Sequence, residues 1–558
     1  MMPRLAHVLI CGVLFAAVPA ISLAQPAPAA APPKPAAIRG RVTAADTGRP
    51  LRRAQISVIG IGSGVERRTT STNVRGEYEL RDLPAGRYTI NATRSGYIPW
   101  EYGRRAPGEP GKSLLVDEGV TLEKIDLAMP RAGIISGRVI DETGEPVAGV
   151  NVWIMRQEFY RGRRKLVPAA SSARSDDTGH YRAFGLQPGA YFVVAMLRDT
   201  WVAGGEKKQV FGYAPTFFPS TATADEGQRV SLAAGKEAPN VDIALVAMPA
   251  ATISGTAVRA DGTPLDAASV SLEQNITGPS GSSFSSAGGA RTEADGSWRF
   301  RDVAPGEYEV SISTTNREGI RETATTAIIV SGVDIDGVSL VAEAPVTLSG
   351  SLITDDGTPL PAGQSRPRVV ADPITPGRRP TQIVMGDDNG LVSSSGAFSY
   401  KTMRGPAVVQ VWSLPAGWTV KSVEIGGRDA VDNVIDVKGG PAIDGVKVVV
   451  TNKFPTLSGR ITDDKGADTE GIVVLFPADE TRWLGIGDNV RHARTDQTGL
   501  FRLSTVPPGD YLAVALETLQ PWQAADPEFL ATLKDAASRV TVREGQPSQL
   551  TLALLHRR

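Results

Sequence analysis

One sequence pattern recurs five times along this 558-residue chain, and the recurrence limits the possible folds more than any other feature. Each copy has a glycine followed two positions later by an aromatic residue, and four copies continue into a Pro/Gly turn and a tyrosine. The glycines stand 103, 117, 100 and 103 residues apart, at Gly76, Gly179, Gly296, Gly396 and Gly499. A period of this length suits a domain with its own core, and it exceeds one solenoid rung or propeller blade.

The spacing inside each copy predicts β-strands. The aromatic residue and the residue two positions later would point to one face of a strand, because side chains alternate between faces. These aromatic residues are Tyr78, Tyr181, Trp298, Phe398 and Phe501.

A tyrosine follows the Pro/Gly turn in four copies, at Tyr88, Tyr191, Tyr308 and Tyr511, whereas copy four has Val408 at that position. We expect each of these rings to be buried. Each hydroxyl should bond to a backbone group near the turn, because a buried phenol needs a partner.

Further strand-like segments flank each copy. Upstream, a strand that ends in an Asp/Gly turn starts at Gly40, Gly137, Gly255, Gly350 and Gly459, and two more strand-like segments follow downstream. Short strands and frequent turns predict an all-β chain, a linear array of five β-sandwich modules. We define module 1 as residues 38–133, module 2 as 134–250, module 3 as 251–345, module 4 as 346–455 and module 5 as 456–558. Because the joints between modules are short, we expect an extended rod.

The repeat resembles the carboxypeptidase regulatory-like domain, a transthyretin-like sandwich related to Cna protein B-type repeats and to starch-binding-like sandwiches. The resemblance rests on G-x-V…D-x-x-G-x-P-L and G-x-[YWF]-x-[LF]…P-G-x-Y-x-V, and it covers nearly all of residues 38–558, with module 4 divergent. It implies the fold. For function it leaves spacer, binding and accessory roles open, because one fold serves many functions.

The N-terminus predicts export from the cytoplasm. A polar start, an apolar run from Val8 to Val18 and small residues before Gln25 are typical of a cleaved signal peptide, which we place at residues 1–24. Residues 25–37 then form a Pro/Ala-rich spacer. We therefore expect a secreted, periplasmic or cell-surface protein with no transmembrane segment after cleavage. Cys11, the one cysteine, lies in the leader, so the mature chain has no thiol.

The sequence predicts no enzyme, no cofactor and no metal site. Apart from His7 in the leader, its histidines are His180, His492 and His556, and none begins the H-x-x-E pair of a zinc carboxypeptidase. Residues 106–113 imitate a phosphate loop but lead into a strand, so we expect a surface connection there. Acidic turns such as DDTG and DDKG fit turns stabilised by aspartate better than calcium loops. The first strands lack the lysine that an isopeptide bond would need. With 59 basic and 60 acidic residues, nothing favours nucleic acid as a partner.

Four segments exceed what the repeat needs. Residues 156–166 hold Phe159, Tyr160, Arg161, Arg163 and Arg164, and this loop is either a solvated hairpin or a grip for an acidic polymer or a partner protein. Aromatic loops in modules 1 and 2 could stack on sugar rings or cap their own sandwich. They hold Trp100, Tyr102, Tyr213, Phe217 and Phe218. In module 5 we expect an inserted helix, capped by Asp526 and started by Pro527, with Phe529, Leu530 and Leu533 facing inward.

These observations lead to three functional hypotheses. The first is a non-catalytic structural or adhesive protein of the bacterial cell envelope. The second is carbohydrate binding through the aromatic loops of modules 1 and 2. The third is an accessory subunit of a separate hydrolase. The partner would be a polysaccharide or an envelope protein, and the sequence does not define the oligomeric state.

Overall fold

The computed structural model describes residues 35–556, except for short segments between them. These segments are 62–66, 161–162, 171, 204–207, 279–280, 316–319, 358–359, 361–365, 375–388, 416–417, 431, 433, 438–439, 441, 454, 484–489 and 521. The expected signal peptide and most of the expected spacer lie outside the described residues. The first strand begins at Ala36, just inside the segment expected to be spacer.

The described chain is an all-β array of sandwich modules, as expected, and most modules pair two separate sheets. Module 1 contains β1 Ala36–Ala44, β2 Gln55–Ile61, β3 Arg68–Ser71, β4 Glu77–Leu83, β5 Gly86–Thr93, β6 Trp100–Glu101, β7 Leu114–Val116, β8 Thr121–Leu122 and β9 Leu127–Met129. Module 2 contains β10 Gly133–Ile140, β11 Asn151–Tyr160, β12 Arg163–Pro168, β13 Ala173–Arg174, β14 His180–Leu186, β15 Gly189–Met196, β16 Thr200–Ala203, β17 Gln209–Tyr213, β18 Thr216–Phe217, β19 Val230–Leu232, β20 Glu237–Ala238, β21 Ile243–Ala244 and β22 Ala247–Pro249. Module 3 contains β23 Ala251–Arg259, β24 Ser269–Gly278, β25 Gly281–Arg291, β26 Ser297–Val303, β27 Gly306–Thr315, β28 Arg321–Val330 and β29 Ile335–Ala342.

Modules 4 and 5 follow the same plan. Module 4 contains β30 Val346–Thr354, β31 Arg368–Pro373, β32 Ala397–Thr402, β33 Gly405–Trp412, β34 Thr419–Ile425, β35 Arg428–Asp429, β36 Val434–Val437 and β37 Ala442–Thr451. Module 5 contains β38 Leu457–Thr462, β39 Ile472–Pro477, η2 Glu480–Trp483, β40 Arg491–Arg494, β41 Leu500–Leu503, β42 Gly509–Leu516, η3 Gln523–Ala525, α1 Pro527–Leu533, η4 Lys534–Ala536, β43 Ser538–Val542 and β44 Ser548–Leu555. In module 5 a parallel contact between β42 and β44 joins the two sheets along one edge.

Each buried cluster draws its residues from one module. Modules 1, 3 and 4 have one large cluster each, whereas modules 2 and 5 have two clusters each. Each module therefore removes its own apolar surface from water, which is the main favourable term in its folding.

The first strand of every module runs antiparallel to the strand that carries the repeated aromatic residue, and parallel to a strand near the module's end. The pairing always sets a glycine opposite the aromatic residue. The pairs are Gly40 with Tyr78, Gly137 with Tyr181, Gly255 with Trp298, Gly350 with Phe398 and Gly459 with Phe501.

These glycines allow a close approach of the backbone. A Cβ on Gly255 would lie 1.9 Å from the carbonyl oxygen of Val338, and a Cβ on any of the other four glycines would lie 1.8–2.1 Å from a carbonyl oxygen. In module 1 the Tyr78 hydroxyl donates to that same carbonyl, on Ile125, at 2.6 Å. Glycine and aromatic residue therefore act together, the first giving room for the carbonyl and the second covering the bare backbone.

The prediction for the tyrosine that follows the Pro/Gly turn, which we call the corner tyrosine, is confirmed. Tyr88, Tyr191, Tyr308 and Tyr511 are at most 5% exposed. Each hydroxyl donates to the backbone carbonyl four residues earlier, at 2.6, 2.6, 2.8 and 2.9 Å. The ring fills the core and the hydroxyl ties the strand back to the start of the Pro/Gly turn.

Two further local predictions are also confirmed. In the turns, Asp176 Oδ1 accepts from the backbone nitrogens of Thr178 and His180, and Asp463 Oδ1 accepts from those of Lys465 and Ala467. In module 5, α1 begins at Pro527 after Asp526, whose carboxylate accepts from the Glu528 nitrogen, and it buries Leu530 and Leu533. Phe529 is half-buried and packs against the same cluster.

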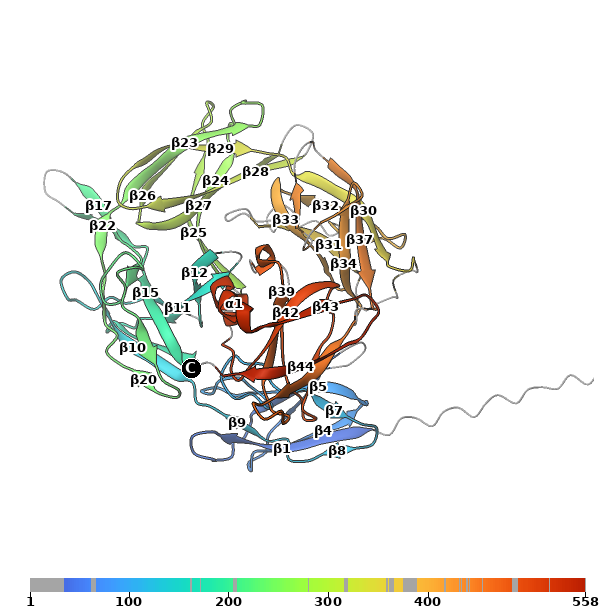
Figure 1. Cartoon of the computed structure of the whole chain (residues 1–558). Helices are drawn as coiled ribbons and strands as arrows, with labels where there is room; N and C mark the ends of the chain where they lie inside the picture. The colour runs from blue at the N-terminus through green and yellow to red at the C-terminus, as the bar shows by residue number, and fades with distance from the viewer. Residues whose placement is uncertain are drawn as a thin grey trace, which may run out of the picture.

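The expected extended rod is wrong. Figure 1 shows the modules following one another around a ring, with module 5 lying against modules 1, 2 and 4. The joints are short, as expected, but a short joint fixes an angle rather than a straight line. Contacts between modules far apart in the sequence close the ring.

The glycine of the first strand should tolerate no side chain. We expect Gly255→Ala to destabilise module 3 by about 1–3 kcal/mol or more, because the new methyl group collides with the Val338 carbonyl. Gly289→Ala is the matched control, since a Cβ there has no heavy atom within 4 Å. Calorimetry of the full chain would measure both variants, and equal effects would contradict this role of Gly255.

Replacing Tyr191 separates its two contributions. Tyr191→Ala should cost roughly 3–5 kcal/mol through the lost ring. Tyr191→Phe should cost only about 0.5–1.5 kcal/mol, because it removes the single bond to the Gln187 carbonyl. We expect the unfolding transition of module 2 to move first, since its core is separate. A single shift of all transitions together would contradict independent cores.

Candidate functional site

A loop of module 1 forms a wedge against module 5. It spans residues 102–113, between β6 and β7, and we call it the wedge loop. Glu101 holds it closed: its carboxylate accepts from the Gly111 nitrogen and from Arg104 Nη2, both at 3.1 Å. We expected residues 106–113 to be a surface connection, and this is wrong because Glu109 is fully buried.

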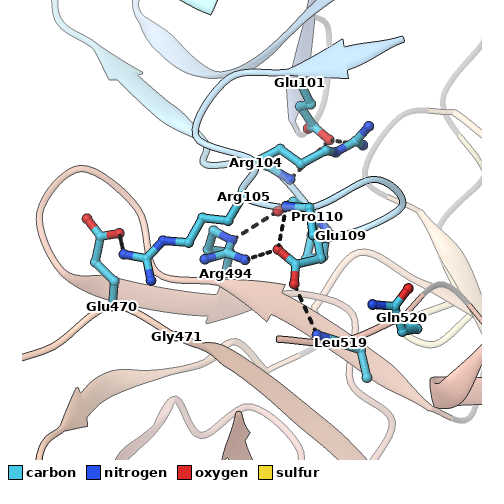
Figure 2. Close-up of polar contacts among 12 residues, drawn as sticks. Glu101, Arg104, Arg105, Glu109, Pro110, Glu470, Gly471, Arg494, Leu519 and Gln520 are labelled. Atoms are coloured by element: carbon cyan, nitrogen blue, oxygen red, sulfur yellow. Dashed lines mark hydrogen bonds and ion pairs between the residues drawn. The ribbon is translucent and has the colours of Figure 1, made fainter. Parts of the chain in front are cut away.

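Glu109 of the wedge loop pairs with Arg494, at the end of β40. Arg494 Nη2 lies 2.5 Å from Glu109 Oε2, and both side chains are 0% exposed (Figure 2). Glu109 Oε1 also accepts from the Leu519 nitrogen at 3.2 Å, and Arg494 Nε donates to the Pro110 carbonyl at 3.1 Å. Burial lowers the pKa of the Arg494 guanidinium, against the opposite effect of Glu109. Desolvation therefore opposes the ion pair, and the hydrogen bonds around it offset that cost.

Further ion pairs surround this buried pair. Arg87 Nη1 lies 2.7 Å from Asp496 Oδ2, and Glu470 binds both Arg105 and Lys112 of the wedge loop. The pKa of Glu470 is lowered, chiefly by its hydrogen bond with Lys112. Together these contacts form one polar, charge-complementary surface, which we call the 1–5 junction.

A hairpin of module 2, formed by β11 and β12, makes the second long-range contact. Arg164 Nη2 donates to Asp526 Oδ2 at 3.1 Å and to Glu528 Oε2 at 2.7 Å, both at the start of α1. The Arg156 guanidinium lies 4.5 Å from the centre of the Trp522 ring. The sequence suggested that this loop binds a partner through charge and stacking. In the structure, Arg156 and Arg164 make such contacts with module 5 of the same chain.

Module 4 completes the ring. Arg482 of η2 binds Asp432 with both Nε and Nη2, the shorter distance being 2.5 Å. Lys421 Nζ lies 2.5 Å from Glu544 Oε1. Module 5 is therefore held by charged contacts to modules 1, 2 and 4.

The aromatic candidates lie against their own modules. Trp100 is 8% exposed within the core of module 1, and Tyr102 packs against that core. Phe217 and Phe218 pack on the two clusters of module 2. Tyr213 is half-buried, its hydroxyl donating to Glu142 at 3.0 Å and its ring 4.6 Å from that of Trp201.

The remaining candidates lie on the hairpin of module 2. Phe159 is half-buried on β11. Tyr160 and Arg163 face each other across the end of the hairpin in the strand register, and Arg161 lies outside the described residues.

The sequence interpretation missed Glu109, Arg494, Glu470, Asp496 and Trp522. Arg494 is not distinctive in the sequence, because Arg174 and Arg291 occupy the same position before the glycine in modules 2 and 3. Those two arginines are exposed, and each donates to a nearby backbone carbonyl. Only the arrangement of modules distinguishes Arg494 from its equivalents.

Among the described residues, no group of three or more His, Cys, Asp or Glu side chains is placed to hold a metal ion. Within the same part of the chain, no helix has the length and apolar character needed to cross a membrane.

Comparison with solved structures finds bacterial pilin subunits among the similar chains. The minor pilin GBS52 of Streptococcus agalactiae is 14% identical, with 38% of this chain and 95% of that chain covered and a TM-score of 0.22. The major pilin subunit BcpA of Bacillus cereus is 10% identical, with 56% and 100% covered and a TM-score of 0.14. The shaft pilin SpaA of Lactobacillus rhamnosus GG is 13% identical, with 39% and 98% covered and a TM-score of 0.18.

The sequence comparisons identify a family. No curated protein matches the sequence significantly. The model of the carboxypeptidase regulatory-like domain matches residues 37–129, 134–246 and 252–337, which together make up just over half of the chain. These matches correspond to modules 1, 2 and 3, whose glycine, aromatic residue and corner tyrosine are described above. The chain therefore belongs to the carboxypeptidase regulatory-like domain family.

Proposed function

We propose that this chain is a non-catalytic structural protein of the bacterial cell envelope, exported by its N-terminal leader, whose modules form a closed scaffold. One observation supports the proposal above the others. The segments that exceed the repeat in modules 1, 2 and 5 contact one another: the wedge loop, the β11–β12 hairpin and α1 with the segment before it. Their side chains are used to hold modules together.

The repeated positions also have a structural role, within each module. The glycine, the aromatic residue and the corner tyrosine build the cores and turns, as described for Gly255 and Tyr191. A scaffold of this kind presents module surfaces in a fixed arrangement. An adhesive role would use those outer surfaces, with an envelope protein or a polysaccharide as partner.

Removing Arg494 should open the scaffold. Arg494→Ala leaves Glu109 buried without its partner, a loss that typically costs about 3–5 kcal/mol if the charge stays buried. Separation of module 1 from module 5 returns Glu109 to water and relieves that cost. By small-angle scattering we expect a radius of gyration above the closed value. A fully extended row of five modules, each with a radius of gyration of about 13 Å, would give roughly 50 Å.

The matched control is Arg291→Ala, which removes the equivalent arginine of module 3. That side chain is exposed, and its Nη1 donates to the nearby Ala267 carbonyl at 3.3 Å. We expect no change in the radius of gyration. An Arg494→Ala chain that stayed as small as the wild type would contradict the role of the junction, and a wild type of about 50 Å would contradict the closed scaffold itself.

Carbohydrate binding through the aromatic loops is the alternative, and it needs rings that are open to a sugar. The burial of Trp100 and the packing of Phe217 and Phe218 favour the capping role instead. Phe159 is half-buried on the hairpin. Assembly with a separate hydrolase would use the same outer surfaces.

A pair of tryptophan variants separates the two roles. Trp100→Ala should destabilise module 1 by about 3–5 kcal/mol, because it removes a buried ring. Trp412→Ala, at a ring that is 52% exposed, should cost far less. Calorimetry measures both, and a glycan array measures retention of polysaccharide. An unchanged unfolding profile with lost retention in Trp100→Ala would favour the carbohydrate alternative.

A further inference from the structure

The 1–5 junction joins two different surfaces from opposite ends of one array. The wedge loop contributes Glu109, Arg105 and Lys112, and module 5 contributes Arg494 and Glu470. Such a contact is heterologous, because neither surface is its own partner. A heterologous contact can close within one molecule or form between molecules.

The path between the two surfaces includes a short joint at which the ring could open. Residues 343–345 connect β29 of module 3 to β30 of module 4. The side-chain contacts across it include Thr323 Oγ1 to Met403 Sδ at 3.6 Å and Arg404 to Glu343 at 3.9 Å. The joint between modules 4 and 5 is stronger, with Arg482 bound twice to Asp432. Opening at residues 343–345 would carry modules 4 and 5 away from modules 1–3 as one unit.

The charges of the junction make such opening feasible. Glu109 and Arg494 lose hydration when the ring closes and regain it when the ring opens, so the net stabilisation is much smaller than the Coulomb attraction. The surrounding pairs of Arg105 and Lys112 with Glu470 are partly exposed and weaken as salt rises. An open molecule therefore keeps both of its junction surfaces folded, hydrated and free to bind.

We propose that module 1 of one copy also binds module 5 of a second copy through this junction, which gives a closed pair of chains. The occupant of each opened surface is the complementary end of another identical chain. Both junctions are restored in the pair, so the ion pairs of the 1–5 junction are kept. The balance depends on concentration, because closure within one chain competes at an effective concentration on the order of 1 mM. This inference rests on the closed scaffold proposed above.

Cysteine crosslinking tests this directly, because the chain after the leader contains no cysteine. Lys112 and Glu470 form an ion pair across the junction, so Lys112→Cys and Glu470→Cys place thiols on its two sides. The two single-cysteine chains are mixed at about 0.1–1 mM, opened with about 1 M salt and returned to low salt. A short bismaleimide then joins thiols that face each other.

We expect a covalent dimer that contains one chain of each kind and increases with protein concentration. The matched control pairs Lys112→Cys with Glu544→Cys, a position on module 5 that contacts Lys421 of module 4 instead. The junction pair should give at least tenfold more covalent dimer than this control pair. Equal yields from the two mixtures would overturn the proposal.

The chain that carries both Lys112→Cys and Glu470→Cys distinguishes exchange between copies from closure within one chain. Crosslinking within that chain, without covalent dimer in the mixture, would overturn the exchange between copies and leave the closed scaffold intact. Absence of crosslinking within that chain would overturn the closed scaffold, and the inference with it.

Discussion

Each module depends on a backbone contact that only glycine permits. The first strand has to accept a carbonyl oxygen of the segment near the module's end at a distance where a Cβ would collide, as at Gly459 with the Leu550 carbonyl. The aromatic residue on the neighbouring strand covers the gap. In modules 1 and 2, Tyr78 and Tyr181 also donate their hydroxyls to the equivalent carbonyls, on Ile125 and Val241. The β-sandwich can close only if both parts are present, which is why glycine and aromatic residue recur together through all five modules.

The sequence predicted the contacts within modules well, because they involve residues close along the chain and are repeated. The corner tyrosines, the aspartate turns and the capped α1 each follow from a local rule of hydrogen bonding or packing. The alternation of side chains along a strand predicted the orientation of Trp298. The role of Gly255, its partner on the first strand, became clear only from the close approach of the Val338 carbonyl.

The arrangement of modules could not be predicted in the same way. Glu109 and Arg494 are 385 residues apart, and neither stands out: one lies in a Pro/Gly loop and the other repeats Arg291. A buried ion pair also has no local signature, because its charges resemble any exposed pair until the partner surface covers them. The segments beyond the repeat were the useful signal. Arg164 was singled out as a candidate for an acidic partner, and it contacts Asp526 and Glu528.

The parallel pairing of first and closing strands sets how a module would respond to tension. In module 3, β23 and β29 lie side by side and run in the same direction from Ile253 to Arg259. A force that pulls β23 by its N-terminal end and β29 by its C-terminal end would slide the two strands along each other. The hydrogen bonds between them then bear the force together, whereas an antiparallel pair pulled at one end would open one bond at a time. Under a stretching load, the side-chain contacts between modules would yield first, and the ladders inside each module would resist as mechanical clamps.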